Sequence, residues 1–460
     1  MEHFKIIIMG LLAGGLFSCN SYLDLKPYGQ VIPKTPDEFA SLLNSTLYEI
    51  DYGSDNNIIG NSTTILNYEC FADNLDANLT KYPAGNSLAL YVGNSLNGMQ
   101  NKYRQLYEKI RDCNLIIENM KDDNSELGKD ITAASYTLRG ECYYNLLRWF
   151  CEPYDRENVD DQLGLPLIDH FDMEAKVKRS NMKETVKFIE TSLKDGLAYN
   201  MQNDVYRFDA DVAKAYLAKL YFWTQNWKEV IPLCEELLDK YPLLSGADYV
   251  NMVQDLSTTK TNILIRSAIY QGISSGSETE ITTSVAARPV SKKFIDLFTE
   301  KEADIRYTLS FNAKREEMKR LRGRVRIAEM VLMMAEAYAH QDDTKNALKY
   351  LNLLRSHRIS PYVPYTEASL PDVDAESLLK TDATGKPLTK LMWAILSERQ
   401  KELFMEGDRW FELKRNGRPE FWVSANGLKY TTLKFMYTAP IMQADVELVP
   451  GMQQNPGYEL

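Results

Sequence analysis

The sequence predicts a mostly α-helical protein that carries a second, loop-rich face. Apolar residues recur every three or four positions in several long stretches, which is typical of amphipathic helices. Two pairs of such stretches have helix–turn–helix spacing, and long segments rich in Asn, Gly, Ser, Thr or Pro separate them. With 460 residues, of which 44% are apolar and 25% charged, the chain can bury a large core.

The long single helices come first along the chain. Apolar residues between Met99 and Met120 are spaced alternately by four and three positions, which predicts one long helix. A second helix is predicted over Ile131–Phe150, and a third between Met182 and Leu197. Cysteines fall on apolar faces of this kind, so we expect buried small side chains and neither a metal site nor a required disulfide. They are Cys113, Cys142 and Cys234.

Two helix pairs are predicted at about 211–240 and 327–358. The small residues Ala213, Ala215 and Ala218 line the first helix of the first pair, a spacing similar to tetratricopeptide repeats. Such a pair buries its apolar face only by stacking on a neighbour. Because the two pairs lie far apart in the sequence, we expect an interrupted array rather than a regular solenoid.

Three regions lack a helical pattern, at about 48–97, 262–310 and 359–390. Within the second region, residues 262–270 (NILIRSAIY) are predicted to form a strand. Loops of this length in a compact protein are commonly functional. We therefore expect the helices to form a scaffold and the loops to bind the ligand.

The N-terminus has the pattern of a secretory signal peptide over residues 1–18. Lys5 precedes an apolar or glycine run from Ile6 to Phe17, which is too short to span a bilayer comfortably. Cys19 follows directly and resembles the lipidated cysteine of a bacterial lipobox, although Phe17 stands where a small residue is usual. We expect a single mature domain over 19–460, anchored by lipid at Cys19; the alternative is plain secretion with an incidental cysteine.

Composition and motifs argue against nucleic acid binding and catalysis. The net charge of −11 is unsuited to contacts with phosphates. Residues 272–276 fit the G-x-S-x-G pattern of hydrolases, but residues 278–284 show no helical stripe, so a flexible loop is the better interpretation. The histidines lack metal-ligand spacing. We expect no enzyme activity, no cofactor and no metal.

The most informative segment is 397–415 (SERQKELFMEGDRWFELKR). Its pattern predicts two helices joined at a sharp corner, where Gly407 ends the first helix. We expect Asp408 to accept backbone N–H bonds at the start of the second helix. With no nucleophile or metal ligand nearby, the charges of this segment are interpreted as structural.

In its order of features, the chain resembles the SusD/RagB family of surface nutrient-binding lipoproteins. The features extend from the N-terminus to the end of the chain. They are Cys19, LRWFCEPY at 147–154, the first helix pair, AEMVLMMAEAYA at 328–339, the segment 397–415 and the tail 440–458.

The resemblance implies a SusD-like helical scaffold in a protein on the outer leaflet of a Gram-negative outer membrane. Members cap a SusC-like TonB-dependent transporter and bind glycans, or peptides in some branches, without catalysis. We therefore expect a glycan-binding subunit of an uptake complex. A peptide-binding RagB-like subunit and a tetratricopeptide adaptor that binds only protein are the alternatives.

The segment 312–323 (NAKREEMKRLRG) is shorter and more basic than in many relatives, where a longer insert contributes to ligand contact. Its basic residues could favour an acidic ligand. The alternative is a solvated helix face on which they pair with Glu316 and Glu317.

Sugars stack their apolar faces on aromatic rings while their hydroxyls bond to short polar side chains. Loop residues of these types are therefore the candidate ligand contacts. They are Tyr68, Asp73, Asn74, Tyr82, Tyr91, Tyr270 and Arg288. The tryptophans within predicted helices are expected to lie in the core.

Overall fold

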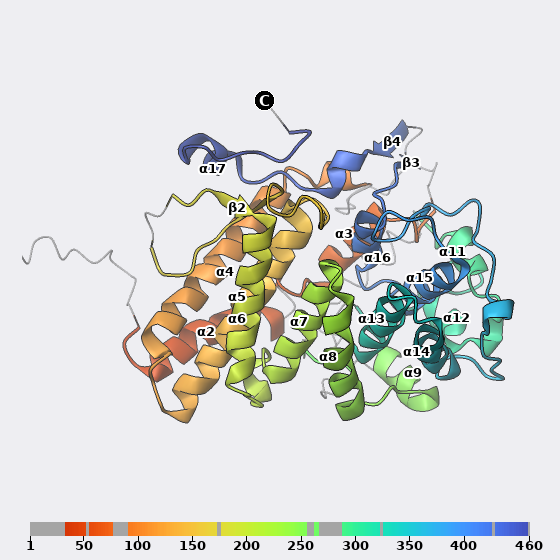
Figure 1. Ribbon diagram of the computed structural model, residues 1–460, viewed down its shortest axis with the longest axis horizontal. Coiled ribbons are helices and arrows are strands. Elements are labelled where there is room, and N and C mark those ends of the chain that lie inside the picture. The colour runs from red at the N-terminus through yellow and green to blue at the C-terminus, as the bar shows by residue number, and fades with distance from the viewer. Residues whose placement is uncertain are drawn as a thin grey trace, which may run out of the picture.

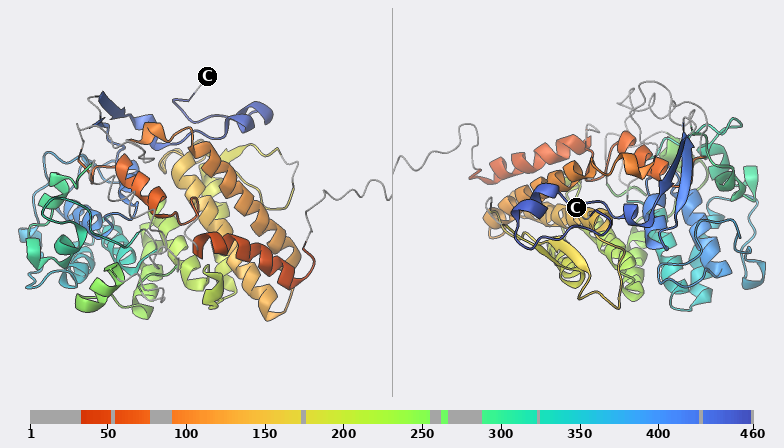
Figure 2. Two further views of the ribbon diagram at one scale, coloured as in Figure 1. Left: turned by 180° about the vertical axis from the view of Figure 1, so that it is seen from behind. Right: turned by 90° about the horizontal axis from the view of Figure 1, so that it is seen from above.

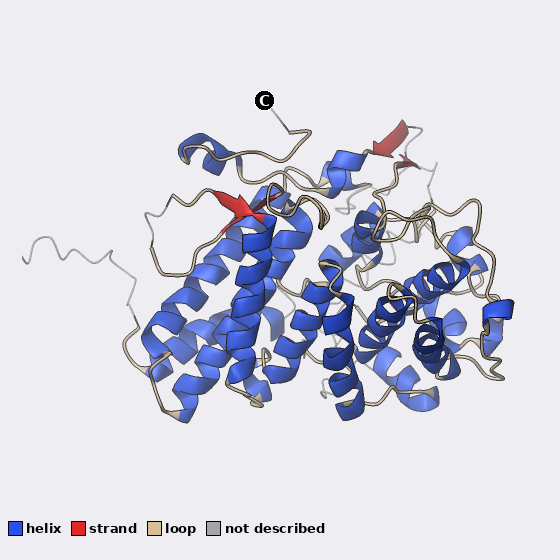
Figure 3. Ribbon diagram, in the orientation of Figure 1, coloured by secondary structure: helices blue, strands red, loops and turns tan. Residues whose placement is uncertain are grey.

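The computed structural model describes residues 33–51, 55–76, 91–172, 176–254, 262–265, 288–322, 325–425 and 428–458. Helices dominate this part of the chain, and its named strands form two small antiparallel sheets (Figure 3). The prediction of a mostly α-helical fold is confirmed.

The first half of the chain builds a bundle of long helices (Figure 1). Its members are α2 (Pro36–Asp51), α4 (Met99–Met120), α5 (Glu126–Phe150) and α6 (Met182–Ala198), while the shorter α3 (Ser62–Phe71) packs on α16 (Arg409–Arg415). Helix α4 has the predicted bounds. Helix α5 begins at Glu126 rather than Ile131, because the Ser125 hydroxyl caps it and accepts a hydrogen bond from Gly128 N at 3.0 Å.

Two glycines allow α5 and α6 to pack closely. A Cβ at Gly140 would lie 2.6 Å from the Leu193 side chain, and one at Gly196 would lie 2.5 Å from Thr137 Oγ1. The helix backbones therefore approach more closely than alanine would permit.

The two predicted helix pairs are present and join the bundle. They are α7 (Ala210–Trp223) with α8 (Trp227–Lys240), and α13 (Ile327–Ala339) with α14 (Thr344–Ser356). Helix α13 packs directly against α8 as well as α14, so the array that is interrupted in the sequence is continuous in space (Figure 1). Lys219 of α7 pairs with Glu329 of α13 across this junction. Helix α15 (Lys390–Glu402) then packs on α13 and α14.

Short elements complete the structure. Strands β1 (Leu163–Pro166) and β2 (Arg179–Asn181) form one sheet, and β3 (Phe421–Ala425) and β4 (Leu428–Thr432) form the other. The remaining α-helices are α9 (Gly246–Gln254), α11 (Lys292–Asp296), α12 (Ile305–Ser310), α16 (Arg409–Arg415) and α17 (Gln443–Leu448). The 3₁₀ helices are η2 (Val92–Asn94), η3 (Asp204–Tyr206), η5 (Lys301–Ala303), η6 (Glu367–Ser369) and η7 (Lys434–Tyr437).

Only part of the strand predicted over 262–270 falls within the described residues. Residues 262–265 contain a single isolated bridge, from Ile263 to Arg326, and no named strand. The G-x-S-x-G segment at 272–276 lies outside the described residues.

The C-terminal segment crosses the top of the helical array and is tied to α5 (Figure 2). Ala439 N donates to Trp149 O at 2.8 Å, and the Asn455 side chain donates to Phe150 O at 2.8 Å. This segment carries the β3–β4 hairpin at one end and α17 at the other, so it links the two flanks of the molecule.

The core is rich in aromatic residues and free cysteines. The predicted burial of Trp149, Trp223, Trp227, Trp393 and Trp410 is confirmed, since each is at most 8% exposed. The five cysteines of the described residues are all free and buried, as predicted for Cys113, Cys142 and Cys234. They are Cys70, Cys113, Cys142, Cys151 and Cys234.

Candidate functional site

The segment 397–415 forms the predicted corner between α15 and α16. Gly407 does not end the first helix as predicted, because α15 already ends at Glu402 with Leu403 as its C-cap. Gly407 lies in the connecting turn, where it adopts φ +74°, a left-handed conformation that glycine takes without steric penalty. The prediction for Asp408 is wrong, because its side chain caps no backbone N–H of α16. It instead accepts two hydrogen bonds from Arg399, at 2.7 Å and 2.6 Å. The arginine occupies the carboxylate that would otherwise cap the helix.

Behind this corner lies a network of fully buried ion pairs. Arg326 donates to Glu406 at 2.8 Å, and Arg358 donates to Glu402 at 2.9 Å. Burial by itself would raise the pKa of Glu402, but Arg358 and Arg326 hold it well below its usual range. Because Glu402 stays charged and both carboxylates are paired with arginine, the network fits a structural role rather than general acid–base chemistry.

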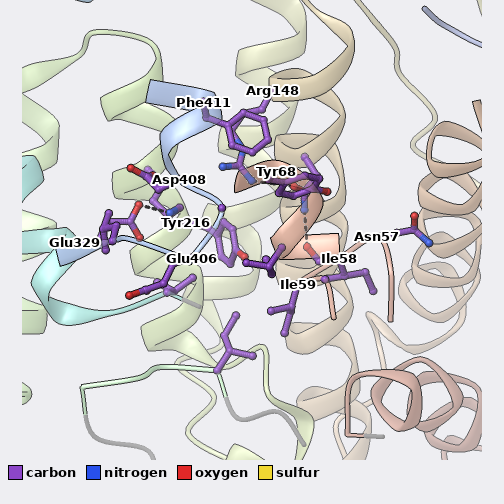
Figure 4. Close-up of a pocket in the computed structure, with 18 residues that line it drawn as sticks. Asn57, Ile58, Ile59, Tyr68, Arg148, Tyr216, Glu329, Glu406, Asp408 and Phe411 are labelled. Carbon is purple, nitrogen blue, oxygen red and sulfur yellow. Dashed lines mark hydrogen bonds and ion pairs between the residues drawn. The ribbon is translucent and has the colours of Figure 1, made fainter. Parts of the chain in front are cut away.

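A small cavity lies beneath the corner (Figure 4). Its volume is about 80 Å³, well below the roughly 300 Å³ at which small-molecule pockets begin. Tyr68 lines it and is 9% exposed, with its ring centroid 5.0 Å from that of Trp149 and 6.0 Å from that of Phe411. Tyr68 is therefore largely buried here, but it also borders a pocket of about 440 Å³ between α3 and α4, so its role as a ligand contact stays a prediction.

A larger pocket of about 380 Å³ opens between α11 and the β3 strand. We call it the α11–β3 pocket. Its walls also include residues of the segment 72–76, which follows α3, and residues of α15. Among the lining residues are Asp73, Asp76, Ser291, Lys293, Phe294, Gln400, Phe421 and Trp422. The volume lies within the range of small-molecule sites.

Trp422 provides an aromatic surface at this pocket. Its side chain is 52% exposed, and the Lys429 ammonium lies 5.0 Å from the centre of its ring. Tyr91 lies next to the same hairpin, with its ring centroid 5.2 Å from that of Tyr430 on β4. Because Tyr430 pairs with Val423 in the sheet, the hairpin brings Tyr91 close to the strand that carries Trp422.

The other predicted contacts have different roles in the structure. Asp73 lines the α11–β3 pocket and pairs with Arg409 at 2.7 Å. Asn74 is 1% exposed and bonds to Glu69 and Gln400. Arg288 is 2% exposed and donates to Cys70 O at 2.7 Å.

The burial of Asn74 and Arg288 corrects their prediction as ligand contacts. Both are polar residues in irregular segments, but they hydrogen-bond to the protein and support the wall behind the pocket. Tyr82, Tyr270 and Cys19 lie outside the described residues.

Trp422 and Tyr430 were missed because the prediction concentrated on the N-terminal loops. The signal was present as FWVSANGLKY at 421–430, where Asn-Gly separates two runs rich in aromatic and β-branched residues. Asn-Gly in this setting is a strong signal for a β-hairpin. A hairpin raises exposed aromatic residues above the helical scaffold.

The basic segment 312–322 matches neither alternative drawn from the sequence. It contains no helix. Arg315 pairs with Asp76, Lys319 is buried against Glu406 at 2.6 Å, and Arg322 pairs with Glu317 at 3.1 Å. Arg315 and Lys319 join the segment to the scaffold and Arg322 pairs within it, so these three cations do not form a patch open to an acidic ligand.

Across the residues that the structure describes, no group of three or more His, Cys, Asp or Glu side chains is arranged to hold a metal ion. In the same residues, no helix combines the length and apolar character needed to cross a membrane.

Two family models match the chain over most of its length. One, described as the SusD family, matches residues 273–458. The other, described as starch-binding associating with outer membrane, matches residues 21–222. The chain belongs to the SusD/RagB family. Among curated proteins, none matches it in sequence.

Solved structures share the fold. A SusD superfamily protein from Bacteroides thetaiotaomicron is 20% identical with a TM-score of 0.69, over 92% of this chain and 100% of that one. A putative sugar binding protein from Bacteroides vulgatus is 21% identical with a TM-score of 0.66, over 94% of this chain and 100% of that one. A SusD-like carbohydrate binding protein from the same species is 16% identical with a TM-score of 0.64, over 91% of this chain and 98% of that one. At these identities the likeness shows a common fold.

Proposed function

We propose that this protein is a surface lipoprotein that binds a glycan and delivers it to a SusC-like TonB-dependent transporter in the outer membrane. One matching family model is described as starch-binding and associated with the outer membrane. Two proteins of the same fold carry the descriptions sugar binding and carbohydrate binding. These descriptions support a glycan as the ligand and binding without catalysis as the activity.

The exposed ring of Trp422 beside the α11–β3 pocket is the observation that most directly supports the proposal. A flat indole that is 52% exposed beside a pocket of about 380 Å³ suits the apolar face of a sugar ring. The carboxylate of Asp76, the ammonium of Lys293 and the amide of Gln400 line the same pocket. They supply the donors and acceptors that sugar hydroxyls require.

The peptide-binding alternative has less support. A peptide carboxylate or acidic side chain calls for an open basic cluster. Arg315, Lys319 and Arg322 of the basic segment 312–322 do not supply one, because Arg315 and Lys319 pair with carboxylates of the scaffold and Arg322 pairs with Glu317 inside the segment. An adaptor that binds only protein would leave the α11–β3 pocket and its aromatic surface without a role.

The lipid anchor at Cys19 remains part of the proposal and rests on the sequence pattern of residues 1–19. Several acyl chains would hold the mature protein stably at a membrane. Cys19→Ala should prevent incorporation of labelled palmitate and move the protein out of the outer-membrane fraction. If the Cys19→Ala protein were still labelled and membrane-bound, the lipid anchor would be contradicted. The proposed glycan site would not be affected by that result.

Isothermal titration calorimetry against a panel of oligosaccharides tests the glycan function. We expect Trp422→Ala to weaken binding by about tenfold or more, which corresponds to about 1.4 kcal/mol. Tyr48→Ala is the control, since Tyr48 is 56% exposed on α2, a helix that packs on α4 and α5 and not on the pocket. Tyr82→Ala and Tyr270→Ala test whether these loop residues extend the site. Binding that Trp422→Ala leaves unchanged would overturn the proposed site.

A further inference from the structure

A second pocket lies on the other flank of the molecule, where the C-terminal segment covers α4 (Figure 1). We call it the α4–α17 pocket. Its volume is about 320 Å³, which is also within the range of small-molecule sites. Residues of α4, of the segment 166–177 and of the segment 442–452 line it. It shares no lining residue with the α11–β3 pocket, so the two sites are separate.

The walls of the α4–α17 pocket are mainly apolar. Tyr103 and Tyr107 come from α4, with ring centroids 4.9 Å apart. Aliphatic and thioether side chains complete the walls. They are Ile168, Val177, Met442, Val449 and Met452. Such walls suit a ligand with an apolar body.

Two polar groups in this pocket lack a well-formed partner among the described residues. Tyr103 is 2% exposed, and its hydroxyl makes no hydrogen bond of good geometry, although it interacts with the Tyr107 side chain beside it. A buried hydroxyl without a well-formed partner is costly, by roughly 1–3 kcal/mol, and therefore unusual. The Asp445 carboxylate forms no ion pair with a described residue, and burial raises its pKa. After burial itself, the charge of Asp445 is the largest influence that raises the pKa of Tyr103, which indicates that the two groups are neighbours.

The cations at the rim are already paired with other acids. Arg104 pairs with Glu108, one turn further along α4. Arg111 pairs with Asp112 at 2.7 Å, and His170 pairs with Asp169 at 2.6 Å. Asp445 is thus left as a half-buried acceptor in an apolar pocket. A ligand that complements it brings a positively charged hydrogen-bond donor.

We propose that the α4–α17 pocket binds a small primary amine with an apolar body, such as an arylalkylamine. Its ammonium group would donate to the Asp445 carboxylate and the Tyr103 hydroxyl, while its body packs against Met442 and Met452. A sugar fits less well, because its several hydroxyls need polar partners throughout the site and the walls are mainly apolar. A carboxylate ligand would be repelled by Asp445.

Phenethylamine is the probe, titrated into the mature protein and followed by ligand-observed NMR and calorimetry. We expect saturable binding, with 2-phenylethanol at least fivefold weaker and 3-phenylpropionate weaker still. This comparison requires no mutation. Equal affinity for the alcohol and the amine would overturn the proposal, as would the absence of saturable binding by phenethylamine.

Variants then locate the site. Asp445→Asn is expected to weaken phenethylamine binding at least fivefold, and Tyr103→Phe, which keeps the buried ring, is expected to weaken it measurably. Glu236→Gln removes the same charge from an exposed residue of α8 that does not line the pocket and should change affinity less than twofold. A folded Asp445→Asn protein that binds phenethylamine as wild type does would contradict the assignment.

Discussion

At the scale of single residues, buried charges hold the corner of the SusD/RagB scaffold. Arg409 is 4% exposed and bonds to Asp73 at 2.7 Å and 2.9 Å and to Glu412 at 2.7 Å. It therefore joins α16 to the segment that follows α3. Asp73 lines the α11–β3 pocket, so this ion pair supports one wall of the glycan site that we propose.

Arg409→Ala should lower stability more than glycan affinity, because Arg409 lies buried in the wall of the α11–β3 pocket and its guanidinium is bonded to Asp73 and Glu412. Removal of one partner from a buried ion pair leaves carboxylates unpaired and commonly costs about 3–5 kcal/mol. Urea denaturation and the melting temperature measure this loss, and calorimetry on the folded protein measures affinity. An unchanged melting temperature would contradict the structural role of Arg409.

The raised pKa of the buried Glu69 side chain predicts that the stability of the protein depends on pH. Burial raises its pKa to about 7, against a usual value of 4.5. Between these values the folded state binds more protons than the unfolded state, so the contribution of Glu69 to stability falls as pH rises from 4.5 to 7. The shift corresponds to about 3 kcal/mol.

The difference in unfolding free energy between wild type and Glu69→Gln isolates this contribution. We expect wild type to lose stability relative to the variant between pH 4.5 and 7 and the difference to level off at higher pH. Urea denaturation at a series of pH values measures it. A difference that does not change with pH would contradict the raised pKa of Glu69.

Sequence reasoning at this scale succeeded where helical position determined burial and failed in the irregular segments. The core tryptophans were predicted because each lies in a helix. Asn74 and Arg288 were misassigned because their partners, Glu69, Gln400 and Cys70, come from parts of the chain that no local pattern connects to them. Polar type alone does not distinguish a residue that faces a ligand from one that supports a wall.

At the scale of elements, close contact between α5 and α6 depends on small residues. A Cβ at Gly196 would lie 3.1 Å from Ala133 O and 2.5 Å from Thr137 Oγ1. The backbone carbonyl has little freedom to move, so the helices would have to separate.

Gly196→Ala should therefore destabilise the protein by about 1–2 kcal/mol, since overpacking exceeds the gain of about 1 kcal/mol in helix propensity. Lys187→Ala, at an exposed position of the same helix, should change stability by less than about 0.5 kcal/mol. Urea denaturation compares the two. A more stable Gly196→Ala protein would show that the contact between α5 and α6 is looser than described.

Regular helices were the elements best predicted from sequence. The apolar stripe of α4 reproduced the observed bounds, and the first helix pair ends at Lys240 as predicted, because burial of one helix face imposes a strong period on the sequence. The polar first turn of α5 was missed because it carries no such period. The β3–β4 hairpin was missed because it is short, and its Asn-Gly signal was not weighed.

At the scale of the whole molecule, packing joins segments that the sequence separates. Helix α8 meets α13, and the C-terminal segment returns to α5, so one array supports both flanks. No periodicity predicts which helix faces which when long loops intervene. The array leaves the α11–β3 pocket on one flank and the α4–α17 pocket on the other.

Hydrogen–deuterium exchange with a glycan identified by calorimetry tests the central claim most directly. We predict slower exchange in the presence of the glycan at 72–76, 291–297, 421–425 and 428–432, the segments at the α11–β3 pocket and its hairpin. Protection confined to other segments would contradict this location. The absence of binding by every glycan in a broad panel would contradict the proposed function itself.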